Sequence, residues 1–332
     1  MIIAEIGQAH DGSLGIAHSY IDAVAKSGAH AIKFQTHVAD AESSIYDKWR
    51  VKFSRQDDSR YDYWKRMEFS FKEWEGLRQH AKEVGLKFLS SAFSIKAFEI
   101  LEKIDVDAWK IASGEISNFQ LLDKMISTTK PVYLSTGMST LSEIDNVIKT
   151  IQNAGNPICL FQCTSMYPTP SQKWGLNIVK FFKEKYQNCS IGFSDHSGDI
   201  YSSLAAITLG ADIVEVHVVF DKNIFGPDTS SSITLNQLEK LVIGEKEIKN
   251  ALENPVDKDS MAIELADTKT LFNKSVFTSI DVKKNEILTE KNCIFKKPGT
   301  GIPISKWKKI KGSKFKKDFK KGMMISIEDI CS

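Results

Sequence analysis

Two lysines lie inside stretches of sequence that otherwise resemble buried strands. Lys33 lies in the apolar run His30–His37, and Lys110 lies in the run Ala108–Glu115. Burying an ammonium group costs several kcal/mol unless a counter-charge accompanies it. One such lysine is often only a buried ion pair, but two on separate strands favour a site for phosphate or carboxylate. Hydroxyl groups near the ends of neighbouring runs would add hydrogen-bond donors to this site: Ser91, Ser113, Ser135 and Ser194.

Two histidines, His196 and His217, end consecutive strand-like runs. Imidazoles on neighbouring strands can reach one divalent metal ion, and Glu5 and Glu215 can hydrogen-bond the waters of that ion. A site of nitrogen and oxygen ligands without a thiolate suits Mn2+ or Mg2+ better than structural zinc. A lone histidine would more often be a core residue, but the pair favours a metal. His10 is either a third site histidine or an ordinary loop residue.

Eight short runs rich in Ile, Val or Phe are predicted to be the strands that position these residues. Most of the runs are continuously apolar until a polar end, which is typical of strands covered on both faces. The eight runs are Ile2–Gly7, His30–His37, Lys87–Phe93, Ala108–Glu115, Pro131–Met138, Cys159–Ser165, Ser190–His196 and Ile213–Phe220.

Segments with helical periodicity separate the strands. One apolar helical face begins at Leu141, preceded by Thr140 and Glu143 at capping-box spacing, and Gly155 stands where that helix should end. Strand and helix alternating eight times predict an α/β fold, the (β/α)8 TIM barrel, whose active sites lie at the C-terminal ends of the strands. A doubly wound open sheet is the alternative, but no glycine-rich fingerprint follows the first strand.

One connection, between His37 and Lys87, is about 50 residues long. A connection of this length is usually a lid, a binding element or an interface. An aromatic-rich helical excursion that packs on the barrel wall is an equally good interpretation. Its aromatic residues include Tyr46, Trp49, Tyr61, Tyr63 and Trp64.

The composition excludes several classes of protein. With 332 residues, 42% hydrophobic and 26% charged, the chain is neither disordered, collagen-like nor a disulfide-stapled miniprotein. No apolar run reaches 18 residues, so we expect no membrane span, and the first strand-like run begins without a basic leader. Five cysteines without a CxxC pair predict reduced thiols in a cytoplasmic protein.

Charge is distributed unevenly along the chain. Residues 273–332 carry 15 Lys, no Arg and 6 acidic residues, a balance of +9, whereas residues 1–272 carry a balance of −7. A basic tail can bind nucleic acid. Without arginines or a stacking motif, a basic module beside an acidic domain is the better interpretation, and we expect no nucleic-acid partner. The predicted domains are a barrel over 1–255, a linker over 256–272 and a small β-rich domain over 273–332.

The ordered motifs of this chain resemble the bacterial sialic acid synthases, which join phosphoenolpyruvate to an N-acylated amino sugar. The resemblance covers nearly the whole chain, and its C-terminal part resembles the antifreeze-like (SAF, β-clip) domain of these enzymes. The motifs are IAEIG (Ile3–Gly7) with His10–Gly12, IKFQTH (Ile32–His37), KIASGE (Lys110–Glu115), LSTGM (Leu134–Met138), CTSMYPTP (Cys163–Pro170), GFSDH (Gly192–His196), EVH (Glu215–His217) and GPD (Gly226–Asp228).

The resemblance implies a role for each matching residue. It implies Mn2+ (or Mg2+) at the barrel mouth on His196 and His217, with Glu5 near the reacting atoms. Our catalytic candidates are Glu5 or Glu215, which would orient a water molecule, and Lys110, which would stabilise the departing phosphate. The resemblance also implies a domain-swapped homodimer, in which the antifreeze-like domain reaches the active site of the other subunit. Phosphoenolpyruvate contacts fall on Lys33, Lys110, Ser113, Ser135 and Ser194, and sugar contacts on Gln35, Glu115, Tyr167 and Asp228, with Ser91, Ser165 and Lys297 as further substrate-binding candidates.

Three positions depart from the family pattern: Ala9, Ser165 and Lys297. The family usually has an arginine at the position of Lys297, touching the acyl group of the sugar, and lysine cannot reproduce its planar two-pronged donor. The expected sugar is N-acetylmannosamine, and the departure at Lys297 is the reason to keep the 2,4-diacetamido-2,4,6-trideoxymannose of legionaminic acid synthesis as the alternative.

The expected reaction is metal-dependent condensation with phosphoenolpyruvate, releasing phosphate by C–O cleavage. Two other functions remain open at this stage. One is a metal-dependent aldolase or isomerase that acts on a phosphosugar. The other is a binding protein whose basic C-terminal module holds nucleic acid or polysaccharide, although a scaffold has no need to bury two lysines.

Overall fold

Eight parallel strands close into a barrel, because the first strand pairs with the last as well as with the second. This computed structural model describes residues 1–331. The predicted TIM barrel is confirmed, and the alternative of an open doubly wound sheet is wrong. A short strand β9 (Ile233–Thr234) pairs with the end of the last barrel strand. The barrel strands are β1 (Ile2–Gly7), β2 (Ala31–Thr36), β3 (Lys87–Ala92), β4 (Trp109–Ile111), β5 (Val132–Ser135), β6 (Ile158–Cys163), β7 (Ser190–Asp195) and β8 (Ile213–Val219).

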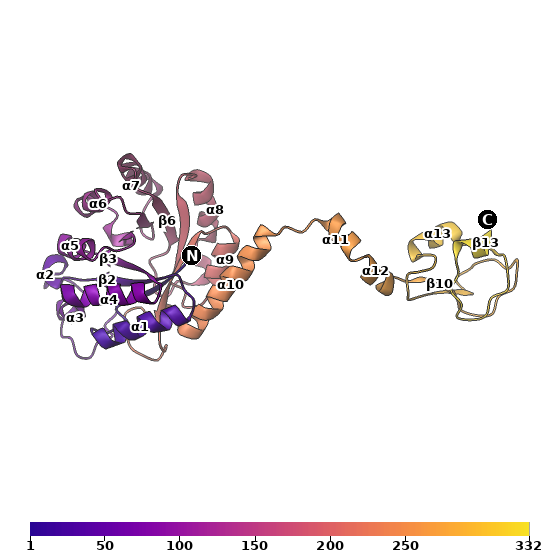
Figure 1. Cartoon of the computed structure of the whole chain (residues 1–332), viewed down its shortest axis with the longest axis horizontal. Coiled ribbons are helices and arrows are strands. Elements are labelled where there is room, and N and C mark those ends of the chain that lie inside the picture. The colour runs from indigo at the N-terminus through magenta and orange to yellow at the C-terminus, as the bar shows by residue number, and fades with distance from the viewer. Residues whose placement is uncertain (332) are drawn as a thin grey trace. The chain divides into compact units, whose positions relative to one another are not determined.

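Helices connect the strands and cover the outside of the barrel (Figure 1). The predicted capping box of Thr140 and Glu143 is present at the start of α7, which ends at Gly155 in the left-handed region with φ of 82°. None of the described helices is both long and apolar enough to cross a membrane. The helices of this part of the chain are α1 (Leu14–Lys26), α2 (Ala39–Glu42), α3 (Arg60–Met67), α4 (Phe71–Glu83), α5 (Ile95–Lys103), α6 (Phe119–Ile126), α7 (Leu141–Ala154), α8 (Leu176–Lys185), α9 (Tyr201–Thr208) and α10 (Leu235–Glu253).

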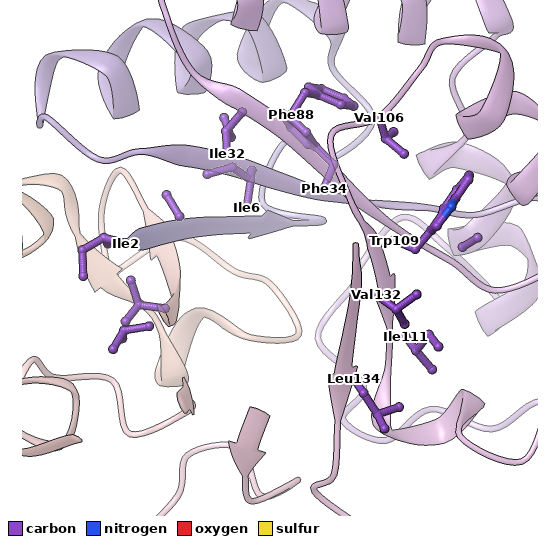
Figure 2. Packing of buried hydrophobic residues seen from close by; sticks show 14 of the residues in the cluster. Ile2, Ile6, Ile32, Phe34, Phe88, Val106, Trp109, Ile111, Val132 and Leu134 are labelled. Atoms are coloured by element: carbon purple, nitrogen blue, oxygen red, sulfur yellow. The ribbon is translucent and has the colours of Figure 1, made fainter. Parts of the chain in front are cut away.

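The main core lies between the strands and the surrounding helices. Alternate residues of each strand, such as Ile32 and Phe34 of β2, face outward from the barrel (Figure 2). The Phe34 ring packs on Trp74 of α4. This core contains about fifty buried apolar residues, and it explains why the strands read as continuous apolar runs. The barrel is therefore held in shape by its outer layer, which leaves its inner positions available for other chemistry.

The inner positions change character along each strand. Near the N-terminal ends they form a second apolar cluster that includes Ile3 and Phe161. A Cβ atom at position 192 would lie 2.6 Å from the Phe161 ring, so only glycine leaves room for this aromatic inside the barrel. Two residues further along the same strand as Ile3, the inner position is Glu5, and it is buried. The apolar layer thus forms a base on which charged side chains are held at the C-terminal ends.

Two predicted strands are shorter than expected at their C-terminal ends. The run Pro131–Met138 forms strand only over Val132–Ser135. The run Ala108–Glu115 forms strand only over Trp109–Ile111, and Ser113–Glu115 form a turn of 3-10 helix. The polar segment after Ile111 turns at the rim instead of continuing the ladder, which brings Ser113 towards the neighbouring strand ends. Its hydroxyl accepts a hydrogen bond from the backbone N–H of Gly137 at 3.0 Å.

The residues from Asn254 onward form a second compact unit. Its core is a cluster around Phe315, Trp307 and Val276, and two short antiparallel pairs join β10 (Ser275–Thr278) to β11 (Cys293–Lys296) and β12 (Lys314–Phe315) to β13 (Ile330–Cys331). The segment expected as a linker contains the helices α11 (Lys258–Glu264) and α12 (Ala266–Phe272), and a one-turn helix α13 (Trp307–Ile310) follows. The unit is small, but its likeness to an antifreeze-like domain stays a prediction.

Candidate active site

A cavity of about 380 Å3 opens at the C-terminal ends of the barrel strands. We call it the main cavity. Fourteen of the sixteen predicted site residues line it, although they come from every part of residues 1–228. Those fourteen are Glu5, Lys33, Gln35, Ser91, Lys110, Ser113, Ser135, Ser165, Tyr167, Ser194, His196, Glu215, His217 and Asp228.

The floor of the main cavity consists of Glu5, Lys33, Lys110, Ser194 and Glu215, all of which are buried. Lys33 Nζ lies 2.6 Å from Glu5 Oε2 and 3.6 Å from Glu215 Oε1. Lys110 Nζ lies 3.0 Å from the other oxygen of Glu215. The Ser194 hydroxyl donates to Glu215 Oε1 at 2.9 Å. Glu215 therefore holds both lysines, one through each carboxylate oxygen.

The floor has a surplus of positive charge. Burial raises the pKa of Glu5 to about 7, although Lys33 opposes this effect, so Glu5 is only partly ionised near neutral pH. Burial also opposes ionisation of Glu215, but Lys110 and Lys33 outweigh it and lower its pKa. Burial alone would lower the pKa of Lys33, but Glu215 and Glu5 together raise it. Two ammonium groups thus face less than two carboxylate charges, and the floor attracts an anion.

Lys110 is the more available of the two lysines. Its Nζ lies 3.6 Å from the centroid of the Phe161 ring, on the apolar base of the barrel. Its contact with Glu215 is an ion pair without an aligned hydrogen bond, and no other side chain of residues 1–331 provides one. A buried ammonium group with unused N–H donors is a binding element for phosphate or carboxylate oxygens.

The two predicted metal ligands lie on neighbouring strand ends. The ring centroids of His196 and His217 are 5.4 Å apart. The Nδ1–H of His196 donates to the Thr164 carbonyl at 2.8 Å, which leaves its Nε2 as the lone-pair atom, 3.2 Å from the Tyr167 hydroxyl. Burial lowers the pKa of His196 to about 4 and that of His217 to about 3, so both rings are neutral at pH 7.

This set of donor atoms fits a metal ion that keeps several coordination positions for water or substrate. Neutral imidazoles are metal ligands, and a second ring nitrogen bonded to a carbonyl is the usual support for one. Asp228 adds a carboxylate oxygen 4.0 Å from His217 Nδ1. Within residues 1–331, no three His, Cys, Asp or Glu side chains are grouped as a complete metal cluster. The positions of His196, His217 and Asp228 are compatible with a site completed by water or substrate oxygens.

Residues of the long connection form one wall of the main cavity. We call Trp49, Arg50, Phe53, Tyr63 and Trp64 the wall. Trp49, Phe53 and Tyr63 pack together with ring centroids 5.1 to 5.6 Å apart. The connection is therefore a helical excursion whose aromatic residues also line the main cavity. The aromatic content of this segment was a signal for the wall, but nothing in the sequence singled out Arg50.

Arg50 links the wall to the opposite side of the cavity. Its Nη2 donates to Asp228 Oδ1 at 2.6 Å and to the Pro227 carbonyl at 2.8 Å. Its guanidinium lies 4.4 Å from the centroid of the Tyr167 ring. Asp228 and Tyr167 are both predicted sugar contacts, so Arg50 determines how these two side chains are presented.

Two predicted site residues do not line the main cavity. Glu115 lines a neighbouring cavity of about 240 Å3, which shares Gln35, Arg60, Trp64 and Phe93 with the main one. Lys297 belongs to the second unit, where its Nζ lies 4.6 Å from the centroid of the Phe272 ring. Its role and the predicted domain-swapped dimer stay predictions. His10 does not line the main cavity either, because its Nδ1 accepts from the Gly12 N–H and its ring packs on Phe69.

Comparison with known proteins places this barrel and cavity in a family. The model of the NeuB family matches residues 20–257. The chain is 32% identical to an N,N'-diacetyllegionaminic acid synthase of Campylobacter jejuni, over 98% of both chains. It is 30% identical to a pseudaminic acid synthase of the same species, over 99% of this chain and 96% of the relative.

A solved structure agrees with these relatives. The crystal structure of an N-acetylneuraminic acid (sialic acid) synthetase from Leptospira borgpetersenii is similar with a TM-score of 0.70 and 30% identity, covering 80% of this chain and 91% of that one. The chain belongs to the NeuB family. The predicted membership in the sialic acid synthase family is thereby confirmed, and the protein is an enzyme of this family.

Proposed function

We propose that the protein condenses phosphoenolpyruvate with the open-chain form of an N-acylated mannosamine-type sugar and yields a nonulosonic acid and phosphate. The observation that carries the proposal is the floor, in which two buried lysines, one of them with unused N–H donors, open into a cavity lined by hydroxyls. The names of the relatives, which are synthases of nine-carbon sugar acids, support this class of product.

The floor matches the chemistry of phosphoenolpyruvate. Lys110, with unused N–H donors, and Lys33 would hold the phosphate and carboxylate groups of the enol. Ser113 and Ser135, which line the same cavity, would donate further hydrogen bonds to these oxygens. Glu215 keeps the two lysines apart and fixes their directions, since each of its oxygens contacts a different ammonium group.

The reaction balances with one water molecule. The enol carbon forms a bond to the aldehyde carbon of the sugar, water adds at the adjacent phosphorylated carbon, and the C–O bond to phosphate then breaks. One proton of the water reaches the former aldehyde oxygen, and the other leaves with phosphate. Glu5 is the side chain placed to orient that water and accept its proton, because it lies at the floor between Lys33 and Gln35. Lys33 and Lys110 stabilise the departing phosphate.

We propose Mn2+, or alternatively Mg2+, as the metal held by His196 and His217. The ion would supply Lewis acidity to the aldehyde oxygen of the sugar. Tyr167 lies against both rings, with centroids 4.2 Å from His196 and 5.9 Å from His217, and so restricts how a sugar oxygen approaches them.

The neighbouring cavity favours a sugar without a phosphate group. Its acidic residues are Glu42, Asp47 and Glu115. Arg60 in the same cavity is paired with Asp47 at 3.1 Å, so its charge is already compensated. A sugar phosphate that reached this cavity would meet net negative charge, whereas sugar hydroxyls would find acceptors.

N-acetylmannosamine is our first candidate for the sugar. The second candidate is 2,4-diacetamido-2,4,6-trideoxymannose, the sugar of the legionaminic acid alternative. The observation in its favour is Lys297 in place of the arginine that the family usually has, together with the similarity to a diacetyllegionaminic acid synthase over 98% of both chains.

A substrate panel tests the proposal directly. Purified protein with Mn2+ and phosphoenolpyruvate is incubated separately with each acylated amino sugar, with N-acetylmannosamine 6-phosphate and with no sugar. We expect phosphate release and a nine-carbon acid of matching mass with at least one unphosphorylated sugar, and neither without sugar. Failure to consume phosphoenolpyruvate with every sugar would overturn the proposal, and turnover only with a sugar phosphate would overturn the argument from the second cavity.

A further inference from the structure

A chain of hydrogen bonds connects the long connection to the floor. We call Glu42, His37, Gln8 and Gln35 the relay. Glu42 Oε1 contacts His37 Nδ1, and His37 Nε2 lies 2.7 Å from Gln8 Nε2. Gln8 Nε2 donates to Gln35 Oε1 at 2.5 Å, and Gln35 Nε2 donates to Glu5 Oε1 at 2.8 Å. The relay therefore begins on α2 and ends on the carboxylate of Glu5.

Its first contact fixes the tautomer of His37. A carboxylate only accepts hydrogen bonds, so the Nδ1 atom that faces Glu42 carries the ring proton. In the neutral ring Nε2 is then an acceptor, which is what the amide nitrogen of Gln8 requires. If Nε2 carried a proton, its N–H group would face the N–H groups of the Gln8 amide, and two donors would meet. His37 Nε2 also lies 3.4 Å from Gln35 Oε1, but its shorter contact with the Gln8 amide nitrogen favours the ring in which Nε2 accepts.

The same direction continues through the two amides. Gln8 uses its NH2 group for both His37 Nε2 and Gln35 Oε1, so Gln35 can only accept on that side. Gln35 must then present its NH2 group to Glu5. If the amide of Gln35 turned over, its oxygen would face the Glu5 carboxylate, and two acceptors would oppose each other. Each amide alone has little preference between its two orientations, whereas Glu42 gives the chain one polarity.

Packing holds the histidine ring in the plane that the relay needs. The His37 ring is stacked between Trp64, with centroids 3.9 Å apart, and Phe93, at 4.6 Å. The interplanar angles are 20° and 9°, so the ring can turn only within its own plane. His37 and Gln8 are both buried, which keeps water from replacing either bond.

We propose that Glu42 and His37 are positioning residues for the reaction, which act through Gln8 and Gln35 on the Glu5 carboxylate. This inference rests on the proposed function, in which Glu5 orients the attacking water. Lys33 holds one oxygen of Glu5, and the relay holds the other. Without the relay, Glu5 keeps its ion pair but loses the bond that directs its second oxygen.

The first test replaces His37 by phenylalanine. His37→Phe keeps a flat ring between Trp64 and Phe93 but removes the acceptor for Gln8. We expect kcat to fall by about 10- to 100-fold, as for other residues that orient a reacting group from behind, while KM for phosphoenolpyruvate changes by less than about threefold because Lys33 and Lys110 are intact. A kcat within twofold of the wild-type value would overturn the inference.

The second test uses two replacements of Glu42. Glu42→Gln retains a side-chain oxygen that accepts from His37 Nδ1, and we expect it to keep most of the wild-type kcat. Glu42→Leu has no acceptor, and we expect it to lose about as much kcat as His37→Phe. A merely structural role would lower the melting temperature but would not separate these two variants in kcat at equal folded fraction. His80→Phe, on the outer helix α4, serves as the matched control and should leave kcat unchanged.

A third measurement does not depend on activity. Long-range 15N–1H NMR of the imidazole nitrogens, with the His37→Phe protein identifying the signal, reports which ring nitrogen carries the proton. We expect the Nδ1–H tautomer for His37, and an Nε2–H tautomer or a doubly protonated ring would contradict the relay. Absence of phosphoenolpyruvate consumption by the wild-type protein would instead contradict the proposed function, and the tautomer would still decide whether the relay exists.

Discussion

The floor and the wall of the main cavity are built from different kinds of sequence. The floor residues sit on barrel strands, where their backbones are fixed by ladders on both sides and their side chains are buried. The wall residues come from a connection of about 50 residues, with Trp49, Arg50 and Phe53 outside any helix or strand. Arg50, with 42% of its side chain exposed, is among the most accessible residues of the cavity.

The floor and the wall differ in this way because they serve two different tasks. Charged side chains that stabilise an anion formed during a reaction need fixed positions and a site with little water. Strand ends inside a closed barrel provide both. Groups that recognise a variable sugar can lie on a surface segment, because loops tolerate changes in sequence and length. We therefore expect changes in the floor to reduce the rate of reaction and changes in the wall to alter the preference for sugars.

The largest effect should come from Lys110. Lys110→Met keeps a side chain of similar length against Phe161 but removes the ammonium group. We expect phosphate release to fall by about 100- to 1000-fold, as when one preorganised donor is removed from an active site. Lys185→Met, which removes a surface lysine paired with Asp145, is the control. Near-normal turnover by a folded Lys110→Met protein would contradict the role of the floor.

The second largest effect should come from loss of the metal ion. We expect chelation of the wild-type protein to abolish turnover and added Mn2+ to restore it, because the two neutral imidazoles are the proposed ligands. In His217→Ala, equilibrium dialysis should show loss of tightly bound Mn2+ even where no substrate is present. The same metal content in His217→Ala and wild type would show that the ion, if any, binds elsewhere. His80 lies outside the main cavity, so the control variant His80→Ala should bind Mn2+ as the wild-type protein does.

A smaller effect is expected in the wall. Arg50→Lys keeps a positive charge but cannot contact Asp228, the Pro227 carbonyl and the face of Tyr167 together. We expect KM for the sugar to rise by about fivefold, the range for a partly exposed ion pair, with kcat for the preferred sugar nearly unchanged. Steady-state kinetics with two sugars measures this. A loss confined to kcat would mean that Arg50 acts on the rate of reaction, as the floor residues do, and not on sugar recognition.

The smallest effect concerns the anchor of the wall, Arg66, whose guanidinium lies 5.5 Å from the centroid of the Tyr63 ring. Arg66 forms two hydrogen bonds through Nε and Nη2 to Asp57, and these bonds lower the pKa of that carboxyl. A lowered pKa in the folded state stabilises the protein above about pH 4, the unfolded value, and this stabilisation is lost as pH falls through the folded value. Asp57→Asn should lower the melting temperature at pH 7 by about 2–4 °C.

The pH dependence provides the control for this last variant. Below the folded pKa of Asp57 the wild-type carboxyl is itself neutral, so the difference in melting temperature between Asp57→Asn and wild type should shrink towards zero. A difference that stays constant from pH 7 to pH 3 would mean that the ion pair does not anchor the wall.

The floor could be predicted from sequence because two patterns coincide in it. Strands buried on both faces read as apolar runs, and a lysine such as Lys33 or Lys110 inside such a run is conspicuous. Parallel strands then bring their polar ends to one rim, so Glu5 and His217, far apart in the chain, become neighbours in the ladder. The resemblance to a known family added the roles of these residues but not their geometry.

The wall, the second cavity and the relay could not be predicted in the same way. Nothing in the sequence distinguishes Arg50 from the other charged residues of the long connection, because its function depends on where an irregular segment places it. Glu115 was expected among the sugar contacts, and the turn after β4 places it in a neighbouring cavity whose existence residue spacing does not reveal. The link from Glu42 to Glu5 passes through three side chains, and its existence depends on distances that residue spacing does not determine.

The most direct test of the account follows one oxygen atom. Phosphoenolpyruvate labelled with 18O at the bridging position is converted with the preferred sugar, and both products are analysed by mass spectrometry. If the floor holds the phosphate while water adds at the enol carbon, the bond to carbon breaks and the label leaves with phosphate. Label retained in the nine-carbon acid would mean that the phosphorus–oxygen bond breaks, and it would contradict the proposed chemistry of the floor.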